Sequence, residues 1–373
     1  MKEADFLIAG AGIGGTSCAN WLSEHHSVIV LEMESQPGYH TTGRSVAVYT
    51  EAYGPRTIRA LAKSGFGFLT APPEGFSDIP LSRPHGLFFI AREDQMDALE
   101  TGLKDVQELS PEIQLISADE AVAQIPVLRR DYLAAAFLDP NALALDVNAI
   151  HQGYMRGLKR NGSEIVCNAQ IQGLERKGGK WHASTPAGAF AAPVLINAAG
   201  AWADQLGQMA GARTIGLQPK RRTVIAFNPA NQEVDDHWPV VIDCQEEFYF
   251  KVDAGTVLGS PADETPVEPQ DVQPEEIDIA YTIDRLQTAT TMEISKLQRT
   301  WAGLRSFVPD GIPVAGYDPD AEGFCWCAGQ GGYGIETSVG MGRASAALAR
   351  GEDLPGGIQA VGVSAADLSP ERF

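Results

Sequence analysis

A glycine-rich turn directly after a buried strand most limits how this chain can begin to fold. Residues 6–9 (FLIA) are all apolar, as in a strand that is buried on both faces. The glycines that follow have the G-x-G-x-x-G spacing and are Gly10, Gly12 and Gly15. Residues 16–26 then carry apolar side chains at helical spacing, and residues 27–32 (SVIVLE) are rich in β-branched residues and end in Glu32. This order of strand, turn, helix and strand predicts a Rossmann-like α/β fold.

The residues of this turn serve nucleotide binding in different ways. Gly10 permits a tight turn, Gly12 lets the backbone approach a pyrophosphate, and Gly15 allows the helix to pack closely on the strand. The N-terminus of the helix adds free N–H groups and a partial positive charge. Glu32 stands 20 residues after Gly12, where a carboxylate accepts hydrogen bonds from a ribose diol. These features predict a dinucleotide site, but they do not distinguish NAD from FAD.

Two later stretches repeat the pattern of a buried strand that runs into small residues. They are residues 193–204 (PVLINAAGAWAD) and residues 324–342 (FCWCAGQGGYGIETSVGMG). For either stretch alone, tight packing of a strand on a helix is the simpler interpretation. Three such turns, at the start, middle and end of the chain, indicate one long ligand that is bound by a domain assembled from separated segments.

The segments between these turns have a different character. Residues 81–140 mix short strands such as HGLFFIA with the helix-like stretch REDQMDALETGLKDVQEL, and residues 216–303 alternate strands with turns. They predict a second domain built on a mixed sheet, whereas the nucleotide-binding domain comprises residues 1–80, 141–215 and 304–373. The Pro-rich acidic stretch PADETPVEPQDVQPEE is interpreted as a solvated connection, with a mobile lid as the alternative.

Charge and composition exclude several classes of partner. Asp and Glu outnumber Lys and Arg by 48 to 28, so the formal net charge of -20 disfavours binding to nucleic acid or to an anionic membrane. No apolar stretch reaches the roughly 18 residues that a membrane span needs, and the first strand begins too early to leave room for a signal peptide. We therefore expect a cytoplasmic protein.

The cysteines and histidines indicate neither disulfides nor a metal site. Five cysteines at scattered positions argue against a disulfide framework, which agrees with a reducing compartment. Cys325 and Cys327 alternate in a strand, so both thiols point to one face, where packing is the expected role. No cluster of His, Cys and carboxylate residues has the spacing of metal ligands.

Several longer strings are similar to a known family of flavoproteins. Besides the glycine turn and Glu32, the strings NAAGAWAD, TWAGLRSFVPDGIPVAGY and GQGGYGI resemble the FAD-dependent family of glycine oxidases, sarcosine oxidases and D-amino acid oxidases over almost the whole chain. The strings QPGYHTTGRS, VLRRDY, HQGYMRG, LQPKRR, FYFKVDAG and LSPERF are similar above all to those of bacterial D-arginine dehydrogenases. The resemblance implies a discontinuous FAD-binding domain and a substrate domain whose mixed sheet covers the flavin.

The resemblance also implies which residues hold the cofactor. From the ADP half to the flavin they are Gly10, Gly12, Ile13, Gly14, Gly15, Glu32, Ile171, Gly43, Arg44, Ser45, Ala199, Gly200, Trp202, Gly303, Gly331, Gly332, Tyr333, Gly334 and Ile335. A helix N-terminus near the last turn suits the negative charge that a reduced flavin carries. Sarcosine oxidases tether their flavin through a cysteine just after a motif like AGLRSFVPDG, but here no cysteine follows before Cys325, so non-covalent FAD is predicted.

The substrate residues follow from the same match. Arg222 and Arg305 fall at positions that hold a substrate carboxylate, for which the planar guanidinium is well suited, and Tyr53 and Tyr249 complete and close that site. Alternation along EFYFKV predicts that Tyr249 and Lys251 share one sheet face, with Phe248 and Phe250 on the other.

The predicted amine and side-chain contacts are Thr50, Gly332, Val48 and Leu87. Thr50 and the carbonyl of Gly332 match partners of the amine. Leu87 replaces a glutamate that pairs with the substrate guanidinium in D-arginine dehydrogenases, and Val48 replaces a histidine near the amine. The pocket has thus lost a charge, although Glu51 or Glu336 could restore one. We therefore expect neutral or hydrophobic substrates rather than arginine.

The predicted enzyme is an FAD-dependent D-amino acid dehydrogenase or oxidase. The resemblance implies that a hydride leaves the substrate Cα for the flavin, giving an imino acid that hydrolyses to a 2-oxo acid and ammonia, and no dedicated side-chain base is expected. The electron acceptor is a quinone, another carrier or O2. Oxidation of a secondary amine such as an N-methyl amino acid, NAD-dependent dehydrogenation and a non-catalytic flavin-binding role are the alternatives.

Overall fold

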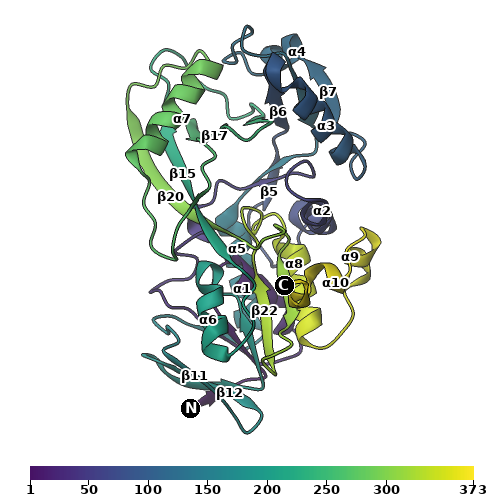
Figure 1. The fold of residues 1–373 in the computed structure, drawn as a ribbon, viewed down its shortest axis with the longest axis vertical. Helices are drawn as coiled ribbons and strands as arrows, with labels where there is room; N and C mark the ends of the chain where they lie inside the picture. The colour runs from purple at the N-terminus through teal and green to yellow at the C-terminus, as the bar shows by residue number, and fades with distance from the viewer.

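Two large sheets, one in each lobe of an elongated molecule, organise the fold in the computed structural model, which describes residues 1–373 (Figure 1). The lobe that contains the N-terminus is built on a six-stranded sheet, and the other lobe is built on a nine-stranded sheet. The combination of a largely parallel sheet, helices and a mixed sheet confirms the predicted α/β fold class.

The six-stranded sheet has the strand order β10-β3-β2-β14-β22-β21, and all its pairs are parallel except β21 with β22. Its strands are β2 (Phe6–Ala9), β3 (Val28–Leu31), β10 (Glu164–Val166), β14 (Val194–Asn197), β21 (Val314–Tyr317) and β22 (Phe324–Ala328). The strands that precede the three small-residue turns, β2, β14 and β22, are adjacent. Because adjacent parallel strands end at the same edge, the three turns meet there.

Both faces of this sheet are covered, which explains why its strands are apolar throughout. Phe6 and Ile8 pack with Cys325 and Cys327 against helices, whereas Leu7 and Leu195 pack on the opposite side. The helices of the first side are α1 (Ile13–Leu22), α5 (Val147–Arg160) and α8 (Ser338–Ala349). The second side is covered by α6 (Ala203–Ala210) and by a small sheet of β1 (Lys2–Glu3), β11 (Gly173–Lys177), β12 (Lys180–Thr185) and β13 (Gly188–Ala192).

The nine-stranded sheet is mixed, and its strands are largely antiparallel, with β6 and β16 as the parallel pair. Its strands are β6 (Leu87–Ala91), β7 (Gln114–Ser117), β8 (Ala135–Asp139), β15 (Gln218–Phe227), β16 (Val240–Asp243), β17 (Tyr249–Asp253), β18 (Thr256–Ser260), β19 (Thr265–Pro266) and β20 (Leu297–Phe307). The long pair of β15 and β20 extends from this sheet towards the N-terminal lobe (Figure 1).

Helices cover one face of this sheet and leave part of the other face open to the first lobe. Phe248 and Phe250 pack with residues of α4 (Ala118–Gln124) and α7 (Glu276–Ala289), as their alternation with Tyr249 predicted. Helix α3 (Met96–Gln107) packs on part of the opposite face, against Phe89 and Ala91 of β6 and Phe137 of β8.

The remaining elements connect the two lobes or end the chain. They are β4 (Val48–Tyr49), β5 (Ser82–Pro84), β9 (Leu143–Leu145), α2 (Arg56–Thr70), α9 (Gly356–Ala360) and α10 (Ala365–Leu368). The strands of the six-stranded sheet lie within residues 1–80, 141–215 and 304–373, and those of the nine-stranded sheet lie within 81–140 and 216–303 apart from the end of β20. The division into two domains at these boundaries stays a prediction.

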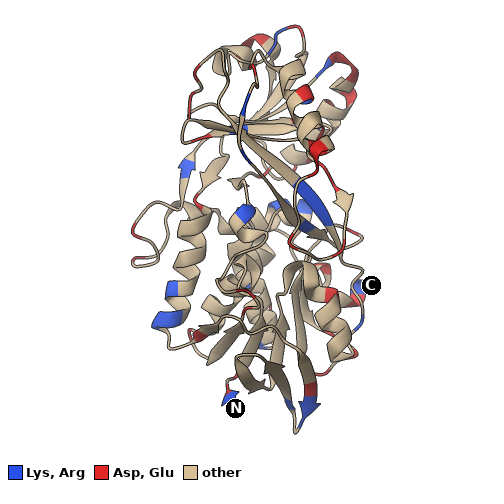
Figure 2. Cartoon of the chain, turned by 90° about the vertical axis from the view of Figure 1, so that its left-hand side faces the viewer, with Lys and Arg blue, Asp and Glu red and all other residues tan.

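Acidic positions are distributed over both lobes rather than gathered at one end (Figure 2). No helix combines the length and the hydropathy that crossing a lipid bilayer requires. The side chains of His, Cys, Asp and Glu form no group of three or more that is arranged to hold a metal ion.

Candidate cofactor and substrate site

A long cavity lies where the three turns of the first lobe meet the open face of the nine-stranded sheet. It runs from Gly10 and Glu32 at one end to Leu87 and Tyr249 at the other. All the site residues predicted from the sequence line this cavity except Gly15, Gly43 and Tyr333. The structure therefore brings together residues from the first turn, the middle turn, the last turn and four strands of the second lobe.

Gly10 and Gly15 are required by backbone packing at the first turn. Gly10 has a φ of +99°, and a Cβ atom there would lie 2.4 Å from the carbonyl oxygen of Ala198. A Cβ atom on Gly15 would lie 1.9 Å from the carbonyl oxygen of Gly10. Gly15 thus brings α1 against β2 and lies behind the cavity wall, in agreement with the packing role that the spacing predicts.

The N-terminus of α1 is open to an anionic ligand. Its N-cap is Gly12, which provides no capping side chain, and no acidic residue lies in the first turn. The Ile13 N–H donates to Thr42 Oγ1 at 2.9 Å, and Gly12 and Gly14 also line the cavity. This arrangement fits the pyrophosphate of a dinucleotide. Thr42 was missed in the sequence, where only its place beside Gly43 and Arg44 connects it with the site.

Glu32 is buried at the end of β3 in a fixed orientation. Its Oε2 accepts a hydrogen bond from the Ala11 N–H at 2.8 Å, and its Oε1 accepts one from the Glu34 N–H at 3.0 Å. Each carboxylate oxygen keeps a lone pair for a further donor. A ribose diol supplies two such donors, so the geometry fits the role that the spacing predicts.

The Pro-rich acidic segment is mostly exposed, as a solvated connection would be, but polar contacts tie it to residues that line the cavity. Arg44 donates from Nη1 to the carbonyl oxygens of Val272 and Ala302, both at 3.1 Å, and its Nη2 pairs with Asp271. The Tyr39 hydroxyl donates to the same Asp271 carboxylate at 3.3 Å. Ion pairs with buried or half-buried cations hold this segment down, because the acidic side chains that mark it as polar have partners in the fold.

The middle and last turns line the part of the cavity that is predicted to hold the flavin, and close packing again requires glycine there. A Cβ atom on Gly331, which has a φ of +54°, would lie 2.3 Å from the ring of Phe307. Gly43 lies behind the wall, since its Cβ would approach the Gly38 carbonyl oxygen at 2.6 Å. The other predicted cofactor residues that line the cavity are Ser45, Ala199, Gly200, Trp202, Gly303, Gly332, Gly334 and Ile335, together with Ile171, which is predicted near the adenine. No cysteine lines the cavity, and non-covalent binding of FAD stays a prediction.

Arg222 and Arg305 converge at the far end of the cavity although they are far apart in the sequence. In the β15–β20 pair, Arg222 lies opposite Gly303 and Lys220 lies opposite Arg305, so both arginines are on the open face. The Arg305 Nη1 donates to the Tyr53 hydroxyl at 3.1 Å, and the Arg222 guanidinium lies 5.9 Å from the centre of the Tyr249 ring.

The two arginines differ in how far the protein satisfies them. Arg222 donates from Nε to the Asp263 carbonyl at 2.9 Å and from Nη2 to Glu264 at 3.2 Å, but its buried Nη1 has no partner. Burial alone would lower the pKa of Arg305, but the neighbouring oxygens of Tyr53 and Tyr249 raise that pKa above its usual value. Arg305 therefore keeps its positive charge, and the unused Nη1 of Arg222 is available as a donor for a carboxylate.

The ring and the hydroxyl group of Tyr53 are each held by a contact with another residue. Tyr333, which does not line the cavity, packs its ring edge-on against Tyr53 with the centroids 5.2 Å apart. The Tyr53 hydroxyl donates to Glu246 Oε2 at 2.7 Å, and burial raises the pKa of this tyrosine above its usual value. Glu246 has a φ of +57°, an uncommon conformation for a non-glycine residue.

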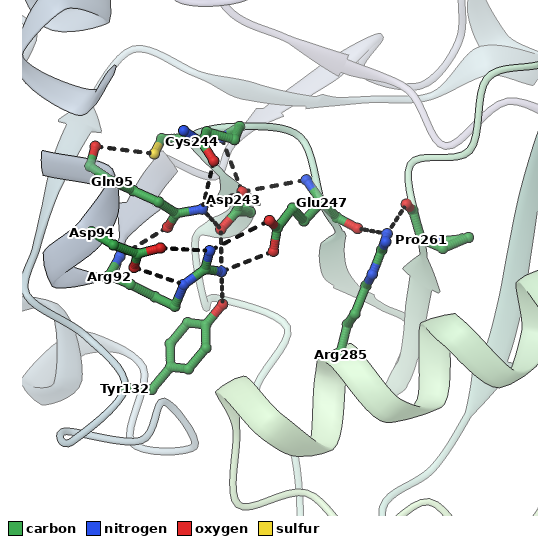
Figure 3. Close-up of polar contacts among 10 residues, drawn as sticks. Arg92, Asp94, Gln95, Tyr132, Asp243, Cys244, Glu247, Pro261 and Arg285 are labelled. Atoms are coloured by element: carbon green, nitrogen blue, oxygen red, sulfur yellow. Dashed lines mark hydrogen bonds and ion pairs between the residues drawn. The ribbon is translucent and has the colours of Figure 1, made fainter. Parts of the chain in front are cut away.

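The turn that carries Glu246 is fixed by a polar network (Figure 3). Asp243 accepts hydrogen bonds from the N–H groups of Gln245 at 2.9 Å and Glu247 at 3.3 Å. Arg92 pairs with Glu247 at 2.8 Å, and Arg285 donates to the Glu247 carbonyl. This network sets the start of β17 and thereby the position of Tyr249.

The side-chain end of the cavity is mainly apolar. Leu87 lies opposite Val240 in the β6–β16 pair, and Ile242 and Val48 line the cavity nearby. Lys251 also lines it, and its Nζ has one weak contact, with the Ala47 carbonyl at 3.5 Å. Burial lowers the pKa of Lys251. Alternation placed Lys251 on the face of Tyr249, so the signal for this residue was present in the sequence.

The sequence did not show whether Glu51 or Glu336 reaches the cavity, and in the structure only one of them does. Glu51 points away from the cavity, where its Oε1 accepts from the Tyr49 hydroxyl at 2.6 Å and its Oε2 pairs with Lys63 at 2.6 Å. Glu336 lines the cavity, and its Oε2 accepts from the Thr50 N–H at 3.2 Å. Only Glu336 can therefore meet a ligand.

Several known proteins are similar to this chain over most of its length. Residues 5–348 match the DAO family, described as FAD dependent oxidoreductase. The chain is 26% identical to hydrogen cyanide synthase subunit HcnC of Pseudomonas aeruginosa, covering 95% of this chain and 94% of that protein. Glycine oxidase from Geobacillus kaustophilus has the same fold, with a TM-score of 0.86, 19% identity and full coverage of both chains. L-Proline dehydrogenase from P. horikoshii gives a TM-score of 0.82, 18% identity, and covers 100% and 98% of the two chains.

Proposed function

The chain belongs to the DAO family of FAD-dependent oxidoreductases, and from this premise we propose that it oxidises the Cα–N bond of a D-amino acid with a neutral or hydrophobic side chain. The product is an imino acid, which water hydrolyses to a 2-oxo acid and ammonia. Bound FAD supplies the two-electron oxidant for this reaction. The observation that carries the proposal is the convergence of Arg222 and Arg305 with Tyr53 and Tyr249 at one end of the cofactor cavity.

The carboxylate of the substrate is bound by the arginines. The unpartnered Nη1 of Arg222 and the Arg305 guanidinium offer charge-assisted hydrogen bonds to it, and the Tyr53 hydroxyl lies beside Arg305. A carboxylate held in this way fixes the orientation of Cα, and orientation supplies much of the rate enhancement when the cofactor performs the redox chemistry.

The side-chain pocket favours an uncharged substrate. Leu87 is fully buried, and the neighbouring Val48, Val240 and Ile242 are apolar. A guanidinium or ammonium placed against them would lose hydration without gaining an ion pair. An apolar side chain would instead gain about 25 cal/mol for each Å² of surface removed from water.

Anaerobic reduction of the bound flavin tests the function directly. We expect D-methionine, D-leucine and D-phenylalanine to bleach its visible absorbance and to be turned over with an artificial acceptor at least tenfold faster than D-arginine or D-lysine. A preference for D-arginine would refute the role of Leu87. Bleaching by N-methyl or L-amino acids alone would replace the substrate class and favour a secondary amine or an L-amino acid.

A further inference from the structure

Three carboxyl groups surround Thr50, but they differ in what they contact. Glu51 is paired with Lys63 outside the cavity. Asp139 is saturated by donors, because it accepts from the Thr50 hydroxyl at 2.5 Å, the Glu51 N–H at 3.3 Å and the Asn141 N–H at 3.0 Å. Neither of these two carboxyl groups lines the cavity. Glu336 is the third group, and it does line the cavity.

The carboxyl group of Glu336 is buried and half satisfied. The residue is 4% exposed, and its Oε2 accepts the Thr50 N–H. Its Oε1 accepts no hydrogen bond within the protein and is not among the fully enclosed polar atoms, so it is open to the cavity, and Glu336 forms no salt bridge. A carboxyl oxygen that opens into a cavity can accept a hydrogen bond from a donor that enters it. The open oxygen therefore points to a donor on the substrate.

The groups that face Glu336 make its protonation responsive to a bound cation. Burial is the main reason that the pKa of Glu336 is raised well above its usual value. Arg305 from β20 opposes this increase, whereas Asp139 from β8 adds to it. The hydroxyl groups of Tyr49 and Tyr333 are also close and neutral, since burial raises the pKa of both tyrosines. A substrate ammonium would be a new cation beside this carboxyl group.

We propose that Glu336 is a catalytic residue that contacts the substrate's amino group and accepts a proton from its ammonium form. The proposal rests on the proposed function, because it requires an amine substrate whose carboxylate is bound by Arg222 and Arg305. Thr50, whose N–H orients Glu336, and the Gly332 carbonyl are the predicted partners of the same amine.

The proton transfer involves only the substrate ammonium and the Glu336 carboxylate, and no further reactant is needed. One N–H bond of the ammonium breaks, an O–H bond forms on the Glu336 carboxylate, and the substrate nitrogen becomes a neutral amine. The nitrogen lone pair is then available to form the C=N bond, which oxidation of the Cα–N bond requires. A carboxyl group with a raised pKa is suited to this transfer, since its proton affinity lies closer to that of an amine.

The pH dependence of kcat/KM distinguishes this role from a structural one. In the wild type, kcat/KM for D-methionine should rise as pH increases through the raised pKa of Glu336. Glu336→Gln keeps the shape of the side chain and the hydrogen bond from Thr50. In this variant the rise of kcat/KM with pH that is due to Glu336 should disappear. We expect kcat/KM near pH 7 to fall about 100-fold and to rise about tenfold per pH unit towards pH 9, where the free amine itself becomes neutral.

Glu51→Gln is the matched control, because Glu51 is a neighbouring buried carboxyl group that does not line the cavity. It should lower the melting temperature through loss of the Lys63 pair and leave the pH profile unchanged. Glu336→Gln should contain full FAD, as measured by its visible spectrum. Glu336→Asp keeps a carboxyl group, so its kcat/KM should still rise with pH as in the wild type, although its kcat should be lower.

Three outcomes would overturn the proposal. The first is a Glu336→Gln enzyme with a wild-type pH profile and less than a threefold loss. The second is a loss confined to D-arginine and D-lysine, which would place Glu336 at the substrate side chain. The third is a wild type that no amine reduces, which would end both proposals. Reduction by N-methyl amino acids alone would refute only the D-amino acid substrate, and the same pH series would then be measured with them.

Discussion

The end of the cavity at the first turn, where we propose that the ADP half binds, is shaped by backbone, whereas the proposed substrate end is shaped by long side chains. At the first turn, Gly10 and Gly15 bring β2, α1 and β14 so close that a Cβ atom would collide with a carbonyl oxygen. At the other end, Arg222 and Arg305 reach in from β15 and β20, and each depends on polar neighbours from other parts of the chain. We therefore expect that residues at the first turn cannot be replaced by larger ones. At the proposed substrate end, we expect that side-chain size can vary but that the charge of the arginines cannot.

This difference separates what the two ends do. Strand-to-helix packing must be correct for the lobe to fold, so cofactor binding and folding are coupled at the first turn. The substrate end stands on a sheet whose core, with Phe248 and Phe250, lies on the opposite face. Substitutions on its open face can therefore change catalysis while the fold and the cofactor are retained.

Substitution of Gly15 should have the largest effect. In Gly15→Val the new Cβ would lie 1.9 Å from the Gly10 carbonyl oxygen, so α1 must move off β2, and we expect colourless and largely insoluble protein. Soluble yield and the ratio of visible to ultraviolet absorbance would measure this. Gly357→Ala in α9, where no atom lies within 4 Å of the added Cβ, is the control and should behave as the wild type. Full FAD occupancy in Gly15→Val would contradict the coupling of folding and cofactor binding.

Removal of either arginine should give the next largest effect, with the cofactor retained. Arg222→Met and Arg305→Met each leave the substrate carboxylate short of a charged donor, so we expect kcat/KM to fall at least about 100-fold, which is about 3 kcal/mol. The matched control is Arg299→Met, since Arg299 is exposed on β20 and stacks on Trp301. Steady-state kinetics and FAD content would be measured together. Losses below threefold in both variants would remove the two residues from the site.

The contrast between the two ends also explains what could be predicted from the sequence. The first end is encoded locally, because Gly10, Gly15 and Glu32 lie within one strand-helix-strand unit whose spacing reflects its geometry. The alternation of Phe248, Tyr249 and Phe250 likewise predicted the two faces of β17.

Contacts between distant segments could not be predicted in this way. Asp271 pairs with Arg44 across 227 residues, and nothing in the local pattern of an acidic, Pro-rich stretch indicates such a partner. The orientations of Glu51 and Glu336 were open for the same reason. Each depends on which groups the fold places beside it, and Lys63 holds Glu51 away from the cavity whereas no cation holds Glu336.

A carboxylate introduced at Leu87 should change specificity without disturbing the cofactor. In Leu87→Glu the pocket would gain a partner for a guanidinium, so we expect the ratio of kcat/KM for D-arginine to that for D-methionine to rise about tenfold or more. Leu87→Met is the matched control, because it keeps an apolar side chain of similar size and should leave the ratio within about twofold. An unchanged ratio in Leu87→Glu would mean that the substrate side chain lies elsewhere in the cavity.

The acidic segment over Arg44 should make the smallest contribution, and it tests whether side chains also matter at the cofactor end. Asp271 is half exposed, and exposed ion pairs are worth about 1 kcal/mol or less, so Asp271→Asn should weaken FAD binding by less than about fivefold. Screening by salt should weaken FAD binding in the wild type more than in the variant, since only the wild type retains the charge pair with Arg44.

Equilibrium dialysis of FAD at low and high KCl would measure both effects. Asp284→Asn is the matched control, because Asp284 is exposed on α7 and forms no ion pair. If Asp271→Asn released FAD completely, the segment would be a principal cofactor contact. The contrast between a backbone-shaped cofactor end and a side-chain-shaped substrate end would then fail, because one exposed carboxylate would outweigh the packing at Gly10 and Gly15.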